Sequence, residues 1–130
     1  MNQIKIYSYQ KLDVWKNSEK LNNKIFNCAA NFPKHQEYIL KSQILRSSLS
    51  ICANIAEGSG RSKGKDQGHF IRIAFSSLME TECHLLIAVN LEYILPEFFN
   101  QELKPLIDVI GRQLNALHKY NLDFITQKNK

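Results

Sequence analysis

Basic residues gather in one short stretch of the chain. Arg61, Lys63 and Lys65 alternate with small residues, and Arg72 follows within two helical turns. Lysine and arginine side chains on a flexible, glycine-containing segment suit contacts with phosphate groups. The stretch itself holds no aromatic residue, so base stacking is not predicted there. We therefore predict weak, sequence-independent binding of RNA or DNA, with a solvated connector as the alternative. Two residues near the chain end are expected to help, namely Lys128 and Lys130.

A second pair that could do chemistry is Arg112 and His118. Their R-x5-H spacing is similar to that of the HEPN ribonucleases, whose arginine and histidine cleave RNA without a metal ion. Six residues of helix turn through about 600°, which leaves the two side chains about 120° apart. They can therefore meet only beside a cleft or across a dimer. A metal-independent ribonuclease of this type is the alternative function.

Glu80 and His84 lie one helical turn apart and could share a metal ion. A di-iron bundle, however, needs a Glu-x-x-His motif on each of two helices, and Glu80, Glu82 and His84 do not supply the second one. The G-x-S-x-G motif of a serine nucleophile is also absent from the sequence. We expect no metal, no cofactor and, apart from the ribonuclease alternative, no enzymatic activity.

A polar line runs along the second apolar segment, through Arg46, Ser50, Asn54 and Glu57 at three- and four-residue steps. Side chains that lie between apolar stripes become partly buried and must find hydrogen-bond partners. Such a ladder at a subunit interface can fix register and copy number, which is the predicted role. A ligand site and a solvated face are the alternatives. Because a glutamate near a helix end opposes the helix dipole, Glu57 is expected to have an arginine partner.

The elements that position these residues are separated by three groups of helix-breaking residues: Pro33, the glycines from Gly58 to Gly68, and Pro96 with Pro105. Gly58 and Gly60 are expected to stop the second helix. Pro105 is expected in the first turn of the last helix, where no amide partner is lost. Between the breaks, apolar residues recur at helical spacing. The predicted helices cover residues 9–31, 36–57, 66–95 and 103–126.

The connections between these helices are short, which predicts an all-α domain over residues 1–130 with the up-down-up-down topology of an antiparallel four-helix bundle. The last helix keeps a strict three-four alternation of seam residues, which begins at Leu103 and includes Asn121. The second and third helices carry more apolar surface than one bundle interior can bury. Because contiguous exposed apolar patches usually mark interfaces, we predict a homo-oligomer.

Composition supports an ordinary globular chain. Of the 130 residues, 44% are hydrophobic and 22% charged, and only 5 glycines and 3 prolines occur. This excludes a mostly disordered protein and disfavours sandwiches and barrels. The net charge of +5 hints at an acidic partner. Met1 to Gln10 do not resemble a signal peptide, and no apolar run is long enough to span a membrane.

The three cysteines are Cys28, Cys52 and Cys83. Their odd number and wide spacing fit neither a disulfide framework nor a zinc site. Each sits among apolar neighbours in the sequence, so all three are interpreted as small core residues. A reducing, cytoplasmic location is therefore expected.

The segment that ends the second helix resembles a known family. The bacterial four-helix-bundle proteins called 23S rRNA-intervening sequence proteins share a pattern close to R-R-A-x-x-S-I-x-x-N-I-A-E-G-x-G-R. The residues that match it are Arg46, Ser50, Ile51, Asn54, Ile55, Ala56, Glu57, Gly58, Gly60 and Arg61. Leu45 and Ser47 depart from it, standing where the family has arginine and alanine. Further matches include Leu12-Asp13-Val14-Trp15, Phe32-Pro33 and Ile73-Ala74.

The resemblance implies a homopentamer of four-helix protomers with no associated enzymatic activity. A related branch comprises the accessory proteins of diversity-generating retroelements, which are basic and bind nucleic acid and a reverse transcriptase. By this analogy of fold, RNA or DNA and a reverse transcriptase are the expected partners besides further copies of the chain.

Overall fold

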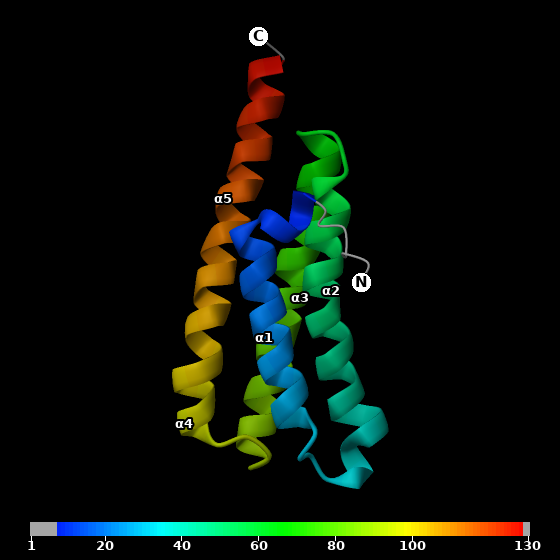
Figure 1. The fold of residues 1–130 in the computed structure, drawn as a ribbon, viewed down its shortest axis with the longest axis vertical. Coiled ribbons are helices and arrows are strands. Elements are labelled where there is room, and N and C mark those ends of the chain that lie inside the picture. Colours follow the sequence, from blue (N-terminus) through cyan, green and yellow to red (C-terminus); the bar gives the residue numbers. More distant parts are fainter. Residues whose placement is uncertain (1–7, 129–130) are drawn as a thin grey trace, which may run out of the picture.

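Four long helices dominate the computed structural model, which describes residues 8–128 (Figure 1). They are α1 (Asp13–Ala29), α2 (Ser42–Ser59), α3 (Lys65–Asn90) and α5 (Lys104–Lys128). The described part contains no strand, so the predicted all-α class with four helices is confirmed. Most of the segment that we interpreted as unlike a signal peptide, Met1 to Gln10, lies outside the described residues.

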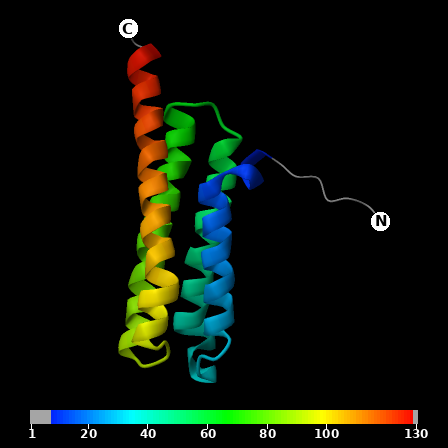
Figure 2. The ribbon, with the colours of Figure 1, turned by 60° about the vertical axis from the view of Figure 1, so that its left-hand side comes forward.

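The chain passes down α1, up α2, down α3 and up α5 (Figures 1 and 2). Contacts between α2 and α3 follow the same course, because Arg46 meets Glu80 whereas Gly58, three turns later, meets Gln67. The last turns of α5 rise beyond the connection between α2 and α3, whereas α1 begins lower. A short 3₁₀ helix, Ser8–Lys11, precedes α1. One end of the bundle is thus built from α2, α3 and α5.

The helix boundaries differ from the predicted ones at several places. The first α-helix covers Asp13–Ala29 rather than residues 9–31, because a separate 3₁₀ helix precedes it. The third helix ends at Asn90 rather than at residue 95, and Glu92 follows with a φ of 66°. The fourth helical stretch begins earlier than residue 103, with α4 (Pro96–Phe98) and a π turn over Phe99–Leu103 that leads into α5. Another π turn, Glu37–Lys41, leads into α2 after a 3₁₀ turn over Lys34–Gln36.

Pro105 is the second residue of α5 and so lies in its first turn, as predicted, although the π turn over Phe99–Leu103 leads directly into this helix and Pro96 opens α4. A proline inside a helix lacks the N–H for the preceding turn, and its ring crowds the carbonyl four residues earlier. The wider π turn that ends at Leu103, directly before Lys104 and Pro105, adds room at that point.

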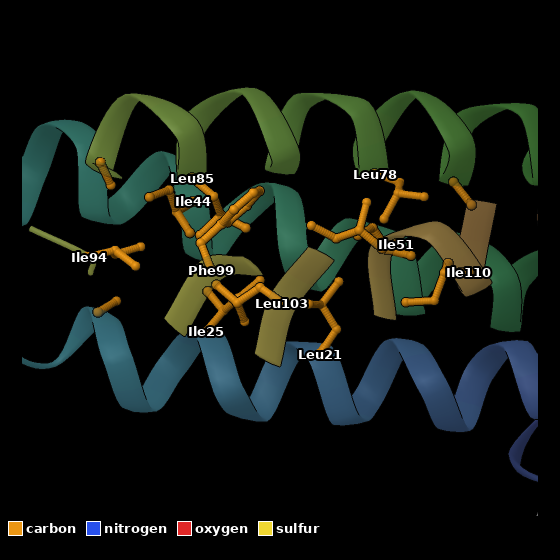
Figure 3. Close-up of a cluster of buried hydrophobic side chains, with 14 of the residues drawn as sticks. Leu21, Ile25, Ile44, Ile51, Leu78, Leu85, Ile94, Phe99, Leu103 and Ile110 are labelled. Atoms are coloured by element: carbon orange, nitrogen blue, oxygen red, sulfur yellow. The ribbon is translucent and has the colours of Figure 1, made fainter. Parts of the chain in front are cut away.

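The core lies where the four long helices meet (Figure 3). The predicted seam residues Leu103, at the end of the π turn, and Ile107, Ile110 and Leu114 of α5 are at most 2% exposed. They pack against side chains of the other helices, including Ile25 and Ile51. Each such aliphatic side chain contributes about 1.5–3 kcal/mol when it leaves water, so this seam is a main source of stability.

Gly58 does not stop α2, contrary to the prediction. It is a buried residue inside the helix, which continues to Ser59 and is capped by Gly60 in an ordinary right-handed conformation. A Cβ atom at Gly58 would lie 3.1 Å from the Cβ of Phe70. Glycine is therefore needed here because α3 approaches the end of α2 closely, and not because the backbone turns.

Candidate nucleic-acid interface

A cleft of about 450 Å³ opens at one end of the bundle, between the start of α3 and the last turns of α5. Figure 2 shows these two segments side by side. On each helix the lining residues follow one another at steps of three or four residues, so each helix contributes one face to the cleft. The side chains that line the cleft are Arg61, Lys65, Asp66, His69, Phe70, Arg72, His118, Asn121, Leu122 and Ile125, together with Gly64 and Gly68.

Three of the four predicted phosphate-binding residues line this one cleft: Arg61, Lys65 and Arg72. All three are exposed. Asp66 is the single carboxylate among the lining residues, so permanent positive charge prevails there. The start of α3 adds the positive end of its helix dipole. The charge of the cleft therefore favours an anion.

The shape of the cleft depends on Gly64 and Asn121. Gly64 has a φ of 104°, which is readily adopted by glycine, and a Cβ atom there would lie 3.3 Å from the Phe124 ring. Asn121 is 1% exposed, accepts a hydrogen bond from the Gly64 N–H at 2.8 Å and donates to Gln67 Oε1 at 3.1 Å. This side chain fastens the α2–α3 connection to α5. The sequence placed Asn121 only in an apolar seam.

His118 faces Arg72 across the cleft, and the ring Nε2 lies 3.3 Å from Arg72 Nη1. Because a guanidinium only donates hydrogen bonds, Nε2 is the acceptor in this contact. The Nδ1 atom is buried and has no hydrogen-bond partner in the structure. His118 is thus joined to the basic group, a connection that the sequence did not indicate because the two residues lie on different helices.

Arg61 is held at the edge of the cleft by two contacts. Its Nη2 donates to Glu57 Oε1 at 2.7 Å, and its guanidinium carbon lies 5.1 Å from the centroid of the Phe70 ring. The arginine partner expected for Glu57 is therefore present, one turn along the chain. Both side chains of the pair remain about half exposed. The guanidinium keeps access to solvent and to a ligand.

Lys63 lies apart from the other three predicted residues. Its Nζ stands 5.5 Å from the centroid of the Tyr120 ring, and it lines a different hollow of about 280 Å³. That hollow is formed with Ser8 and Leu12, on the side of the bundle where α1 begins. The side chains of Lys128 and Lys130, predicted helpers, lie outside the described residues.

The polar line on α2 follows the seam with α3. Ser50 Oγ lies 2.9 Å from Ser77 Oγ, and Asn54 Nδ2 donates to the Ser50 carbonyl at 2.8 Å. Both residues are half-buried, as expected, whereas the Arg46 and Glu57 side chains are about half exposed. They are exposed because they lie at the outer margin of the seam.

Ser47, which stands where the family pattern has alanine, makes a second polar contact in this seam. Thr81 Oγ1 donates to Ser47 Oγ at 2.9 Å, and both residues are fully buried. Each hydroxyl oxygen also lies within hydrogen-bond distance of a carbonyl oxygen of its own helix, Ser47 at 3.2 Å from Ile44 O and Thr81 at 2.7 Å from Ser77 O. The departure from the family pattern is thus compensated across α2 and α3.

The candidate metal ligands Glu80 and His84 contact each other, and Glu80 also contacts Arg46. Arg46 and His84 both contact Glu80 Oε2, the histidine at 3.1 Å. Partial burial raises the pKa of Glu80, but the hydrogen bonds and charges of His84 and Arg46 outweigh it and hold the pKa below its ordinary value. Over residues 8–128 no group of three or more potential metal ligands occurs.

Arg112 and His118 do not share a site within the protomer. Arg112 lines a shallow hollow with Glu82, Lys104 and Asp108, whereas His118 lines the basic cleft. The two side chains point to different surfaces, as the helical spacing implies. The protomer therefore does not bring Arg112 and His118 together, and the ribonuclease alternative stays a prediction.

The cysteine interpretation was wrong for Cys83, which is exposed on α3 between the exposed Met79 and Leu86. Apolar neighbours in sequence do not place a residue in the core when the helix turns that face to solvent. Cys28 and Cys52 are half-buried, and burial raises the pKa of each thiol to about 11. These two thiols are poorly reactive at neutral pH.

A model of the 23S rRNA-intervening sequence protein family matches residues 10–116. The chain is also similar to a solved protein of unknown function from the S23 ribosomal protein family of Bacteroides thetaiotaomicron VPI-5482. That likeness has a TM-score of 0.59 and 26% identity, and covers 86% of this chain and 97% of the other. No curated protein matches. Within residues 8–128, no helix combines the length and apolar character needed to cross a membrane.

Proposed function

Because the chain belongs to the 23S rRNA-intervening sequence protein family, we propose that it is a non-enzymatic, homo-oligomeric protein that binds nucleic acid through the cleft between α3 and α5. The observation that carries the proposal is the convergence of Arg61, Lys65 and Arg72 on this cleft from a loop and a helix face. Phosphate contacts of this kind give weak binding, with a Kd of about 10⁻⁴–10⁻⁶ M per site at physiological salt.

The other basic groups support this choice of surface because several are engaged elsewhere. Lys24 pairs with Glu102, Lys41 with Glu37, and Lys104 with Glu82 and Asp108. Lys65 and Arg72 make no ion pair with a described carboxylate, and Arg61 shares its charge with the exposed Glu57 alone. Other basic residues without a described ion pair, such as Lys16 and Lys34, do not line the cleft, so the cleft brings three available cations together at one place.

Fluorescence anisotropy with labelled single-stranded RNA and DNA at low salt tests the proposal. Changing Arg61, Lys65 and Arg72 together to serine is expected to reduce binding at least tenfold, since these side chains are the cleft's permanent cations. A matched variant with Lys16, Lys34 and Lys41 changed to serine has the same net charge and is expected to bind as the wild type. Equal loss in both variants would show that only net charge matters and would contradict the proposed site.

Lys63 offers a sharper comparison within the same loop. Its side chain packs over Tyr120 outside the cleft, so Lys63→Ser is expected to weaken binding less than Lys65→Ser. Each variant replaces one lysine by serine, so the two differ only in the position of the lost charge. A larger effect at Lys63 would move the binding surface to the side where α1 begins.

Self-assembly into a ring, a homopentamer by resemblance, is the second part of the proposal. The exposed apolar residues Leu49 on α2 and Met79, Leu86 and Ile87 on α3 are each 40–50% exposed, which favours a further contact surface. A ring would repeat the basic cleft, and repeated weak sites gain apparent affinity when one strand reaches several of them. A reverse transcriptase as a protein partner, and a reducing cytoplasm that suits three free cysteines, complete the hypothesis.

Size-exclusion chromatography with light scattering tests the assembly. A mass of several protomers is expected at micromolar concentration, and Met79→Lys combined with Leu86→Lys is expected to lower it. Cys83 lies between these two positions, so its reaction with a maleimide is expected to be slow in the assembly and fast in the double variant. A wild-type monomer at micromolar concentration would contradict this part of the proposal.

A further inference from the structure

The cleft between α3 and α5 has a feature that backbone phosphate contacts do not require, namely an apolar wall. Leu122 is 50% exposed and Ile125 half-buried, and both line the cleft on the α5 side. The volume of about 450 Å³ lies within the range of about 300–1,000 Å³ that is typical of small-molecule sites. Such sites combine apolar walls with a few convergent polar groups. The cleft therefore fits a ligand with one anionic and one flat, weakly polar part.

The polar groups are placed for the anionic part. Arg72 presents a planar guanidinium suited to bidentate phosphate contact. Its Nη1 lies 3.3 Å from His118 Nε2, so His118 holds the guanidinium in the cleft and is a positioning residue for it, while the buried His118 Nδ1 faces away from solvent. Lys65 stands two helical turns earlier on the same lining stripe. Asp66 is the only carboxylate that lines the cleft, and it lies at the start of α3.

The aromatic groups that the basic loop lacks come from α3. The ring of His69 lies 5.2 Å from the Phe70 ring in an edge-on arrangement, and both residues line the cleft. Phe70 in turn carries the Arg61 guanidinium on its ring at 5.1 Å. A planar base can thus lie among ring and aliphatic surfaces, with the cations at hand for its phosphate.

We propose that this cleft binds one nucleoside phosphate group, with the phosphate at Arg72, which His118 positions, and the base against Leu122 and Ile125. The proposal deepens the proposed function, on which it rests for the choice of site. A nucleoside phosphate group can come from a free mononucleotide or from the phosphorylated end of a single strand. The bound unit is one nucleotide in both cases.

Isothermal titration calorimetry with AMP, adenosine and inorganic phosphate tests the claim directly. AMP is expected to bind more tightly than either of its parts. Arg72→Gln is expected to weaken AMP binding about tenfold or more, because it removes a charge-assisted contact. Leu122→Ser is expected to weaken AMP binding severalfold and to leave phosphate binding unchanged. Both positions are exposed, so circular dichroism is expected to show wild-type helix content in each variant.

Lys41→Gln, at the far end of the bundle, is the charge control for Arg72→Gln and is expected to leave AMP binding unchanged. AMP that binds no better than inorganic phosphate would overturn the inference, since no base would then be held. AMP binding that survives both Arg72→Gln and Leu122→Ser would overturn it as well, because the ligand would lie elsewhere.

A short RNA with a 5′-phosphate, compared with the same RNA bearing a 5′-hydroxyl, distinguishes the two sources. Tighter binding of the phosphorylated strand, with AMP as a competitor, supports a strand end as the source. AMP binding without competition by either strand supports a free mononucleotide and contradicts the proposed nucleic-acid function. Strand binding that AMP does not compete with, and that does not depend on the 5′-phosphate, contradicts this inference and leaves the proposed function standing.

Discussion

The carboxamide oxygen of Asn121 accepts a hydrogen bond from the backbone N–H of Gly64 at 2.8 Å, across fifty-seven residues of sequence. Both residues are buried. The same side chain donates to the Leu117 carbonyl at 2.8 Å and to Gln67, so its polar atoms are all used within the protein. Through this contact the loop that carries Arg61 and Lys65 is fixed to α5, and the basic cleft takes its shape.

Asn121→Ala is expected to destabilise the protein by about 1–3 kcal/mol, because the buried Gly64 N–H then has no acceptor. Urea unfolding followed by circular dichroism measures this difference. Asn115→Ala, at an exposed position of the same helix, is the control and is expected to change stability by less than about 0.5 kcal/mol. Equal effects of the two substitutions would contradict the structural role of Asn121.

Gly58 and Gly60 are expected to respond differently to alanine. A Cβ atom at Gly58 would lie 3.1 Å from the Cβ of Phe70, tighter than most Cβ contacts in proteins, whereas at Gly60 the nearest atom would be 3.7 Å away. Alanine gains about 1 kcal/mol of helix propensity inside a helix, and overpacking costs about 1–3 kcal/mol. Thermal unfolding should therefore show a lower Tm for Gly58→Ala and an unchanged or slightly higher Tm for Gly60→Ala. A stabilised Gly58→Ala variant would contradict the close approach of α3.

The ion pair between Arg46 and Glu80 gives a pH-dependent prediction. The folded-state pKa of Glu80 is lowered, so its contribution to stability is present above its ordinary value of 4.5 and is lost as the pH falls through the folded-state pKa. Because both side chains are more than a third exposed, the contribution is at most about 1 kcal/mol. Glu80→Gln is thus expected to be slightly less stable than the wild type at pH 7, with a smaller difference near pH 3. A difference in urea midpoint that is the same at both pH values would contradict this assignment.

Much of the fold could be predicted from the sequence, because apolar periodicity directly reports which helix face is buried. The seam of α5 from Leu103 to Leu114 is an example. The misplaced boundaries have local causes. Pro105 is accommodated by a π turn, and no residue type signals such a turn in advance. Gly58 was assigned to helix termination because its contact with Phe70 depends on how two helices pack.

The candidate site could be predicted only in part. The basic residues 61, 63, 65 and 72 stand out by composition, but sequence proximity suggested that they act together, and the structure separates Lys63 from the rest. The contribution of α5 could not be predicted. His118 and Leu122 line the cleft because the last part of α5 lies beside the start of α3. Position along a single helix does not reveal which distant segment lies opposite.

The salt dependence of single-strand binding tests the central claim most directly. Each phosphate contact on a single strand contributes about 0.7 to the slope of log K against log salt concentration. Changing Lys65 and Arg72 to serine is therefore expected to flatten the slope by about 1.4, whereas changing Lys34 and Lys41, at the opposite end of the bundle, is expected to leave it unchanged. Anisotropy titrations at four or more salt concentrations measure both slopes. The same slope in both double variants would contradict a nucleic-acid interface in the cleft between α3 and α5.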